Sequence, residues 1–133
     1  MKIALGRKIY PMNIAIVYIL ISVLAGGVGQ VILKKGMGAM GPLTLSVSEL
    51  GSILWRMATS PYVVIGLGIY ALGTILWLTA LSRIDLSYAY PFASLGYVIM
   101  LFASWQLFHE NISLLRLVGC VIVVLGVVLI SRT

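Results

Sequence analysis

Apolar residues along this chain gather in four long runs that are separated by short polar segments. The runs cover residues 14–33, 62–81, 86–108 and 114–130. The first three contain no charged residue, and the fourth carries only Arg116, close enough to its start to reach the membrane surface. About 20 apolar residues are needed to cross the hydrocarbon core of a bilayer as a helix. The pattern therefore predicts four transmembrane helices, because backbone groups in lipid must bond within their own segment.

The connections between these runs differ in length. Residues 82–85 and 109–113 form short links, which predict antiparallel neighbours. The first link, from residue 34 to residue 61, is long and contains apolar residues at helical spacing, namely Leu43, Val47, Leu50, Leu54 and Met57. We expect an amphipathic helix in the membrane interface there, with Trp55 at headgroup depth, and the alternative is a disordered loop.

The composition agrees with this interpretation. Hydrophobic residues make up 62% of the chain and charged residues 9%, whereas soluble domains are about 25% charged. The net charge is +6, and the basic residues lie at the ends of the apolar runs, where they meet lipid phosphates rather than nucleic acid. The sequence thus predicts an all-α integral membrane protein with one four-helix domain over residues 1–133 and no nucleic-acid partner.

The basic residues also bear on orientation, since four spans place both termini on one side. That side would hold Lys2, Arg7, Lys8, Arg83 and Arg132. The opposite side would hold Lys34, Lys35, Arg56 and Arg116. The small excess favours cytoplasmic termini, and dual insertion that gives antiparallel dimers is the alternative.

Small residues repeat along the runs and predict close helix contacts. Gly119 and Gly126 lie seven residues apart in the last run, with Val123 on the same face. Such a face lets two backbones approach closely, either within the chain or between two subunits. Four short helices enclose little volume, so we predict that Gly119, Val123 and Gly126 form a dimer interface. Other small residues at such spacings are Gly66 and Gly73 in the second run, Ala25 and Gly29 in the first, and Ala89 and Ala93 in the third.

The sequence contains no arrangement typical of an enzyme. It has one histidine, no acidic residue inside an apolar run, and no serine in a nucleophile motif. The single cysteine, Cys120, excludes an intrachain disulfide and lacks companions for a metal site. We predict no catalytic residues, no cofactor and no metal.

The third run carries polar and aromatic side chains on one helical face. These are Tyr90, Ser94, Tyr97, Leu101, Ser104 and Phe108. Polar groups that face lipid are costly, so this face should point to other helices or to a wet cavity. Pro91 lies one turn inside the run and is either an unstrained N-terminal proline or a kink that shapes a cavity.

Two charged positions at the ends of runs are candidates for substrate contact. Lys34 lies one turn after Gln30 in the first run and could hold a phosphate as a point charge, or Lys34 and Lys35 could simply meet lipid headgroups. Glu110, next to His109, could favour the start of the last helix or pair with Arg116 or a partner subunit.

The turn between the second and third runs is flanked by Arg83 and Asp85. Asp85 has a ready structural role as the N-cap of the third helix. Both residues are more typical of helix architecture than of substrate contact.

With these residues identified, the chain resembles the drug/metabolite transporter superfamily in its four-helix forms. The similarity rests on the order of four pieces: Gly29-Gln30-x-x-x-Lys34, Ala89-Tyr90-Pro91-x-x-Ser94-Leu95, His109-Glu110 and Gly119-x6-Gly126-Val127. Small multidrug-resistance exporters have an acidic residue where this chain has Gly26 and a tryptophan where it has Ala93. This chain lacks both residues. A proton-coupled exporter of small cations or metabolites is the alternative function.

The small EamA-like subunits of the undecaprenyl phosphate–aminoarabinose flippase are more similar. This resemblance implies translocation of a polyprenyl-phosphate-linked sugar, or a similar lipid carrier, across the cytoplasmic (inner) membrane by a homodimer or by a heterodimer with a related four-helix subunit. A non-transporting subunit that assists a glycosyltransferase is a further alternative. The candidate substrate-contacting residues are Gln30, Lys34, Arg83, Tyr90, Ser94, Tyr97, His109 and Glu110.

Overall fold

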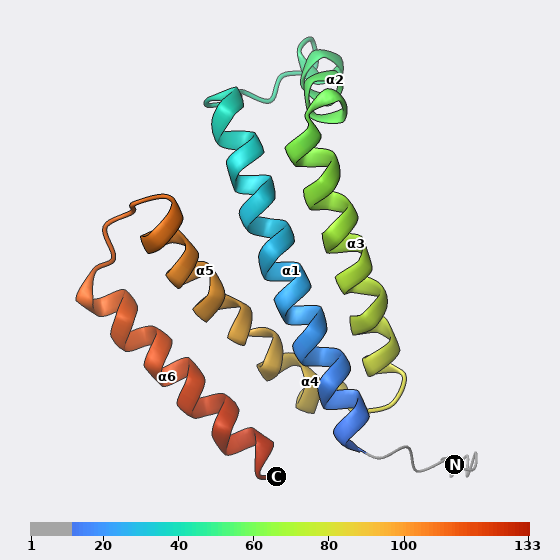
Figure 1. The fold of residues 1–133 in the computed structure, drawn as a ribbon, viewed down its shortest axis with the longest axis vertical. Helices are drawn as coiled ribbons and strands as arrows, with labels where there is room; N and C mark the ends of the chain where they lie inside the picture. Colours follow the sequence, from blue (N-terminus) through green and yellow to red (C-terminus); the bar gives the residue numbers. More distant parts are fainter. Residues whose placement is uncertain (1–11) are drawn as a thin grey trace.

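The computed structural model describes residues 12–133, so Lys2, Arg7 and Lys8 lie outside the described residues. The described part is helical, with no strand (Figure 1). Its elements are α1 (Met12–Met40), α2 (Leu50–Thr59), α3 (Pro61–Leu81), α4 (Leu86–Ala93), α5 (Leu95–Leu107) and α6 (Leu114–Ser131).

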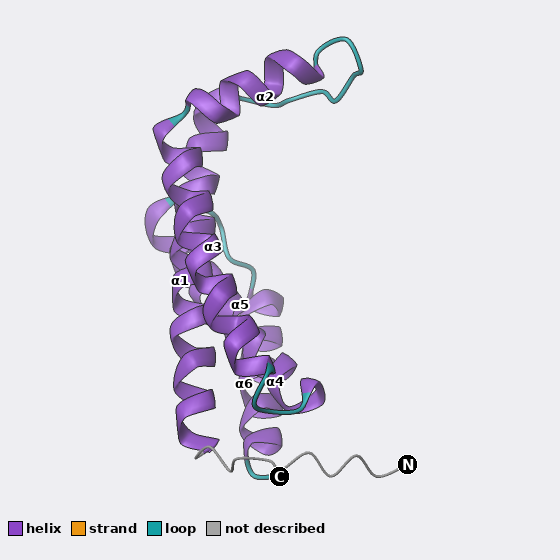
Figure 2. Ribbon diagram, turned by 90° about the vertical axis from the view of Figure 1, so that its right-hand side faces the viewer, coloured by secondary structure: helices purple, strands orange, loops and turns teal. Residues whose placement is uncertain are grey.

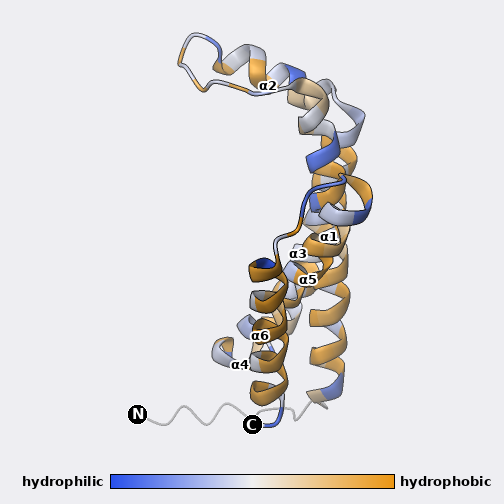
Figure 3. Cartoon of the chain, turned by 90° about the vertical axis from the view of Figure 1, so that its left-hand side faces the viewer, coloured by the Kyte–Doolittle hydropathy of each residue, from blue (hydrophilic) through white to orange (hydrophobic). Residues whose placement is uncertain are grey.

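Four helical segments of the described chain are long and apolar enough to span a membrane, which confirms the predicted number of spans. They are Met12–Met40, Pro61–Leu81, Leu86–Leu107 and Leu114–Ser131. Their apolar middles and more polar ends are visible in Figure 3. The start of α1 and the end of α6 lie at the same end of the bundle, as expected for an even number of spans (Figure 1).

The helix α1 is longer than predicted, because it continues past Leu33 to Met40. Its 29 residues correspond to a length of about 43 Å, more than the roughly 30 Å hydrocarbon core. Hydropathy marks where lipid ends, whereas this helix ends at Gly41, which adopts a φ of 74°. Glycine accepts this left-handed conformation at a helix end without steric cost. Lys34 and Lys35 are therefore helical residues.

The third span is broken at Ser94, between α4 and α5. Pro91 has no N–H to donate, and its ring prevents regular bonding to the preceding turn. The Ser94 N–H instead donates to the Pro91 carbonyl at 3.1 Å, and the Tyr97 N–H donates to the Ser94 carbonyl at 2.9 Å. Pro91 thus accompanies a break rather than an unstrained helix start.

A short helix, α2, connects the first two spans and lies across the end of the bundle (Figure 2). The predicted helix is confirmed, but it begins at Leu50, so Leu43 and Val47 lie outside it. Ser46 and Ser48 bond to each other at 3.3 Å, and the Glu49 N–H donates to the Ser46 carbonyl at 3.1 Å. Serine side chains that bond locally favour such turns over helix.

The apolar stripe of α2 also differs in detail from the prediction. The buried residue is Ile53, which the predicted stripe omits. Trp55 is 71% exposed, a position from which its ring can meet lipid headgroups.

The closest helix pair is α1 with α3, and glycines allow it. A Cβ on Gly29 would lie 2.9 Å from the Gly66 carbonyl oxygen, and one on Gly73 would lie 3.1 Å from the Ser22 carbonyl oxygen. The buried Ser22 hydroxyl donates to the Gly73 carbonyl at 2.7 Å. The expectation that Gly29, Gly66 and Gly73 pack the helices together is confirmed.

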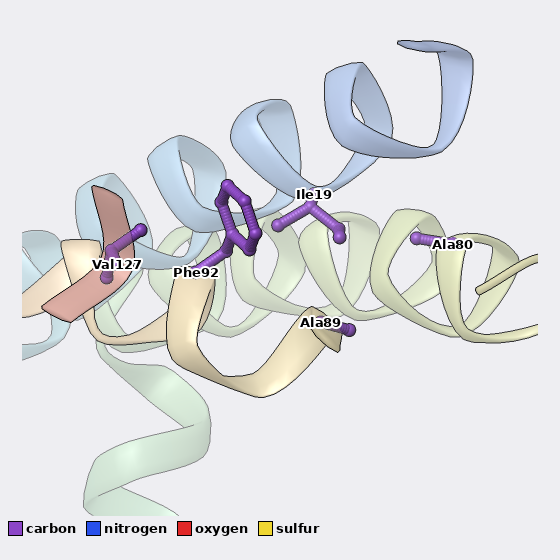
Figure 4. Close-up of a cluster of buried hydrophobic side chains, with 5 residues drawn as sticks. All are labelled: Ile19, Ala80, Ala89, Phe92 and Val127. Atoms are coloured by element: carbon purple, nitrogen blue, oxygen red, sulfur yellow. The ribbon is translucent and has the colours of Figure 1, made fainter. Parts of the chain in front are cut away.

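A buried apolar cluster joins α1, α3, α4 and α6 near the ends where the described chain starts and finishes. Figure 4 shows its members, Ile19, Ala80, Ala89, Phe92 and Val127. Ile19, Ala80 and Ala89 are fully buried. This cluster anchors α4 and the end of α6 against the α1–α3 pair, and it fixes the frame around the candidate site.

Candidate functional site

A groove of about 390 Å³ runs between α1, α3 and the broken third span. Gln30 of α1, Trp77 of α3 and Tyr90 of α4 face it from three elements. The Trp77 and Tyr90 rings meet edge to face, with centroids 5.6 Å apart. Of the face predicted on the third run, Tyr90 lines this groove.

The groove is uncharged, and its largely apolar wall carries a few polar groups. Thr74 and Tyr70 of α3 also line it, and the Thr74 hydroxyl donates to the Tyr70 carbonyl at 3.0 Å. The described residues that line the groove include no Asp, Glu, Lys, Arg or His. Gln30 is exposed along the groove, so its amide is available to a ligand. Aromatic faces, an amide and hydroxyls suit a polar group and offer no carboxylate for proton exchange.

The contribution of α3 was missed in the sequence. Tyr70, Thr74 and Trp77 recur at positions i, i+4 and i+7, and therefore share one helical face. This aromatic and polar stripe is a signal of the same kind as the stripe of the third run.

An ion pair lies beyond this groove, between the last turns of α1 and the loop that follows α5. The Lys34 Nζ atom donates to Glu110 Oε1 at 3.0 Å, and it lies 5.5 Å from the centre of the Phe108 ring. Lys34 is one turn beyond Gln30, about 6 Å along the axis of α1. The late end of α1 therefore brings Lys34 to the loop between α5 and α6.

The environment of Glu110 is electropositive. The hydrogen bond and the charge of Lys34 lower the pKa of the Glu110 carboxyl, and the Ser104 hydroxyl and the Arg116 charge act in the same direction. Arg116, which the sequence suggested as a partner of Glu110, acts as a neighbouring charge, whereas the direct contact is with Lys34, which the sequence analysis did not pair with it. Two cations and one carboxylate leave an excess positive charge at this end.

The loop that carries Glu110 has a defined shape. His109 adopts a φ of 52°, a left-handed conformation in which histidine is over-represented among non-glycine residues. The Glu110 N–H then donates to the Ser104 carbonyl at 3.0 Å. His109 thus turns the chain after α5 and places Glu110 opposite Lys34.

The remaining candidates lie elsewhere. Arg83 is at the other end of the bundle, where its guanidinium lies 5.4 Å from the centre of the Tyr18 ring. Ser94 and Tyr97 do not line the groove with Tyr90, because the break after Pro91 interrupts the helical face that they would share. The Ser94 hydroxyl donates to the Pro91 carbonyl. The structure therefore brings together Gln30 with Tyr90, and Lys34 with Glu110.

The glycines proposed for a dimer interface are open. A Cβ on Gly119 or on Gly126 would meet nothing within 4 Å. These glycines pack against no other helix of the described chain, and a contact between subunits through Gly119, Val123 and Gly126 stays a prediction.

Comparison with known proteins identifies the family. The pattern of the EamA-like transporter family matches residues 49–132, which include three of the four spans and the Glu110 loop. The chain belongs to the EamA-like transporter family. No solved structure gives a significant match.

Curated relatives of this EamA-like chain carry a common name. A protein of Shewanella sediminis is 33% identical over 120 residues, which cover 84% of this chain and 83% of the relative. A protein of Photorhabdus laumondii is 36% identical over 117 residues, which cover 85% and 93%. Both are named probable 4-amino-4-deoxy-L-arabinose-phosphoundecaprenol flippase subunit ArnF.

A second subunit type is also similar. A protein of Aeromonas hydrophila named as subunit ArnE of the same flippase is 33% identical over 77 residues, which cover 58% of this chain and 68% of the relative. The resemblance inferred from the motifs is confirmed, and the chain is a multi-pass membrane protein of a transporter family.

Proposed function

We propose that this chain is a subunit of a flippase that moves a polyprenyl-phosphate-linked sugar across the cytoplasmic membrane. One observation carries the proposal: a basic side chain at the membrane end, Lys34, lies one turn from an uncharged groove of aromatic, amide and hydroxyl groups. A sugar phosphate has the same two parts, an anion and a hydroxylated ring, next to each other.

Lys34 would bind the phosphate as a point charge. Its side chain is 59% exposed, so a phosphate oxygen can reach the Nζ atom. Arg116 adds a second positive charge nearby, as its effect on the Glu110 carboxyl indicates. The phosphate would replace the Glu110 carboxylate as the partner of Lys34. The released carboxylate is exposed to solvent, so its separation from Lys34 costs little.

The groove would hold the sugar. Trp77 and Tyr90 present aromatic rings, and Gln30 presents an amide that can both donate and accept hydrogen bonds. Polar groups at this depth are otherwise costly in lipid, so a polar ligand would offset that cost. The relatives are named as two subunit types of one flippase, which supports pairing with a second, related subunit.

The exporter alternative has less support in this chain. Proton-coupled export of cations needs a titratable carboxylate near the substrate, and Gly26 occupies the corresponding position in the groove. No acidic residue of the described chain lines that groove. No observation favours a subunit that only assists a glycosyltransferase.

Translocation in proteoliposomes tests the proposal. The chain, alone and co-reconstituted with a related four-helix subunit, should expose polyprenyl phosphate–aminoarabinose to a membrane-impermeant amine reagent added outside. Lys34→Ala should slow this exposure by roughly tenfold to a hundredfold, since a charge-assisted contact contributes about 1.5–3 kcal/mol.

Lys35→Ala is the matched control. Lys35 lies 5.4 Å from the centre of the Tyr62 ring, on a different side of α1. Small, equal losses for both variants would mean that the two lysines only meet headgroups. Uptake of quaternary ammonium compounds driven by a pH gradient would instead establish the exporter.

A further inference from the structure

A second groove, separate from the one lined by Gln30 and Tyr90, runs between α5 and α6. Its volume is about 680 Å³. Val98 and Phe102 of α5 face Leu117, Val121 and Leu125 of α6 across it, and the buried Cys120 also lines it. Its lining is apolar except at one end, where Ser113 contributes a hydroxyl.

That polar end adjoins the Lys34–Glu110 pair. Ile112, Ser113 and Leu114 line the groove there, and Glu110 belongs to the same loop. Arg116, in the first turn of α6, acts electrostatically on Glu110. Lys34 and Arg116 therefore lie near one end of the apolar groove. An apolar groove with positive charge at one end suits an anionic lipid.

We propose that the α5–α6 groove binds the hydrocarbon chain of the polyprenyl phosphate while Lys34 and Arg116 hold its phosphate. The identity of the lipid rests on the proposed function. The sugar attached to the same phosphate would then lie in the first groove, beside Gln30. The phosphate would lie between the two grooves, with the hydrocarbon chain in one and the sugar in the other.

The groove is long enough to take an extended hydrocarbon chain. Leu114 and Leu125, which both line it, lie about 17 Å apart along α6. An open groove of this length admits a lipid chain or a helix of a partner subunit, and the positive charge near its polar end favours the anionic lipid.

The position of the groove on α6 also favours a lipid chain as its occupant. Val121 is two residues from Gly119, which places the groove on the opposite side of α6 from the open glycine face. A partner helix on Gly119 and Gly126 would therefore leave the groove free for lipid.

Photocrosslinking tests the proposal on the full chain in nanodiscs of phosphatidylethanolamine and phosphatidylglycerol. The probe is a polyprenyl phosphate with a diazirine in its chain. We expect adducts on α5 and α6 peptides that line the groove, displaced by unlabelled polyprenyl phosphate but not by added phosphatidylglycerol. Val121→Trp fills the groove and should lower the adduct yield by about tenfold or more, the effect of overpacking a filled site.

Val118→Trp is the matched control, because Val118 is on the same helix, is similarly exposed (47% against 53% for Val121), and does not line the groove. Equal yields from the two variants, or equal displacement by phosphatidylglycerol, would overturn the proposal. The proposal would also be overturned if Val121→Trp lost the partner subunit but gave an unchanged yield of lipid adducts, because the groove would then be a subunit interface.

Translocation separates this inference from the proposed function. Groove adducts in a chain that moves no lipid would contradict the flippase and leave the groove as a lipid site. Full translocation by Val121→Trp, with translocation lost in Lys34→Ala, would contradict the groove and leave the flippase intact.

Discussion

Glu110 occupies the position at Lys34 that a lipid phosphate would take. The two side chains are 3.0 Å apart and come from segments 76 residues apart in the sequence. In the free protein the carboxylate is the partner of Lys34. A phosphate bound there, as we propose, would compete with this carboxylate, so Glu110 would lower the affinity for the phosphate while it keeps the lysine oriented.

Glu110→Gln should consequently bind polyprenyl phosphate more tightly than the unmodified chain at pH 7. The gain should be modest, about two- to fivefold, because exposed ion pairs contribute little. Native mass spectrometry or a thermal-shift titration would measure it. Glu49→Gln, a substitution outside the Lys34 site, is the control and should leave the affinity unchanged.

The pH dependence of this effect has a definite sign. The pKa of Glu110 is lowered below its ordinary value of 4.5, so the carboxylate is charged throughout the neutral range. The ion pair stabilises the fold above that ordinary value, and its contribution is lost as the pH falls through the lowered pKa. The affinities of Glu110→Gln and the unmodified chain should therefore converge in strong acid. A difference that persisted there would rule out competition by the carboxylate.

At the scale of the elements, the α1–α3 pair is the part of the bundle in closest contact. Its backbones touch at Gly29 and Gly66, so the pair approaches more closely than any residue with a side chain would allow. Both Gln30 and Trp77 belong to this pair, so the pair forms one wall of the groove that Gln30 and Tyr90 line.

Gly29→Ala should destabilise the chain by about 1–3 kcal/mol, because the new methyl group would meet backbone atoms at 2.9 and 3.1 Å and force the helices apart. Gly68→Ala is the matched control on α3, since a Cβ there meets nothing within 4 Å. Thermal unfolding in detergent would measure both. Equal melting temperatures for the two variants would show that the helices do not approach as described.

At the scale of the whole molecule, the arrangement of spans makes a prediction about topology. The start of α1 and the end of α6 lie at the same end of the bundle (Figure 1). Reporter tags at residue 1 and at residue 133 should therefore report the same side of the membrane. Tags on opposite sides in a uniformly inserted protein would mean that one of the four spans does not cross.

The open glycine face of α6 predicts how two subunits meet. Replacing both Gly119 and Gly126 by Leu should convert a detergent-solubilised dimer to a monomer, because the added side chains prevent close approach of the helices. Light scattering would measure the mass. Gly68→Leu, at an equally open glycine of α3, should leave the dimer intact. A dimer that survived the double substitution would have its interface elsewhere.

The sequence by itself determined the number of spans, the short helix between the first two, and the family. Lipid offers no hydrogen bonds to the backbone, so long apolar runs must be helices, and hydropathy suffices to find them. The ends of the elements were less accessible, since the end of α1 depends on the conformation of Gly41 and the start of α2 on local bonds among Ser46, Ser48 and Glu49.

Only the tertiary structure decided which polar residues meet. The sequence placed Gln30, Lys34, Tyr90 and Glu110 among eight candidates but grouped Tyr90 with Ser94 and Tyr97, which the break after Pro91 removes from the groove. The contact of Lys34 with Glu110 and of Trp77 with Tyr90 depends on how separate helices pack. Hydropathy and periodicity describe one segment at a time, so partners on different helices become visible only when those helices are assembled.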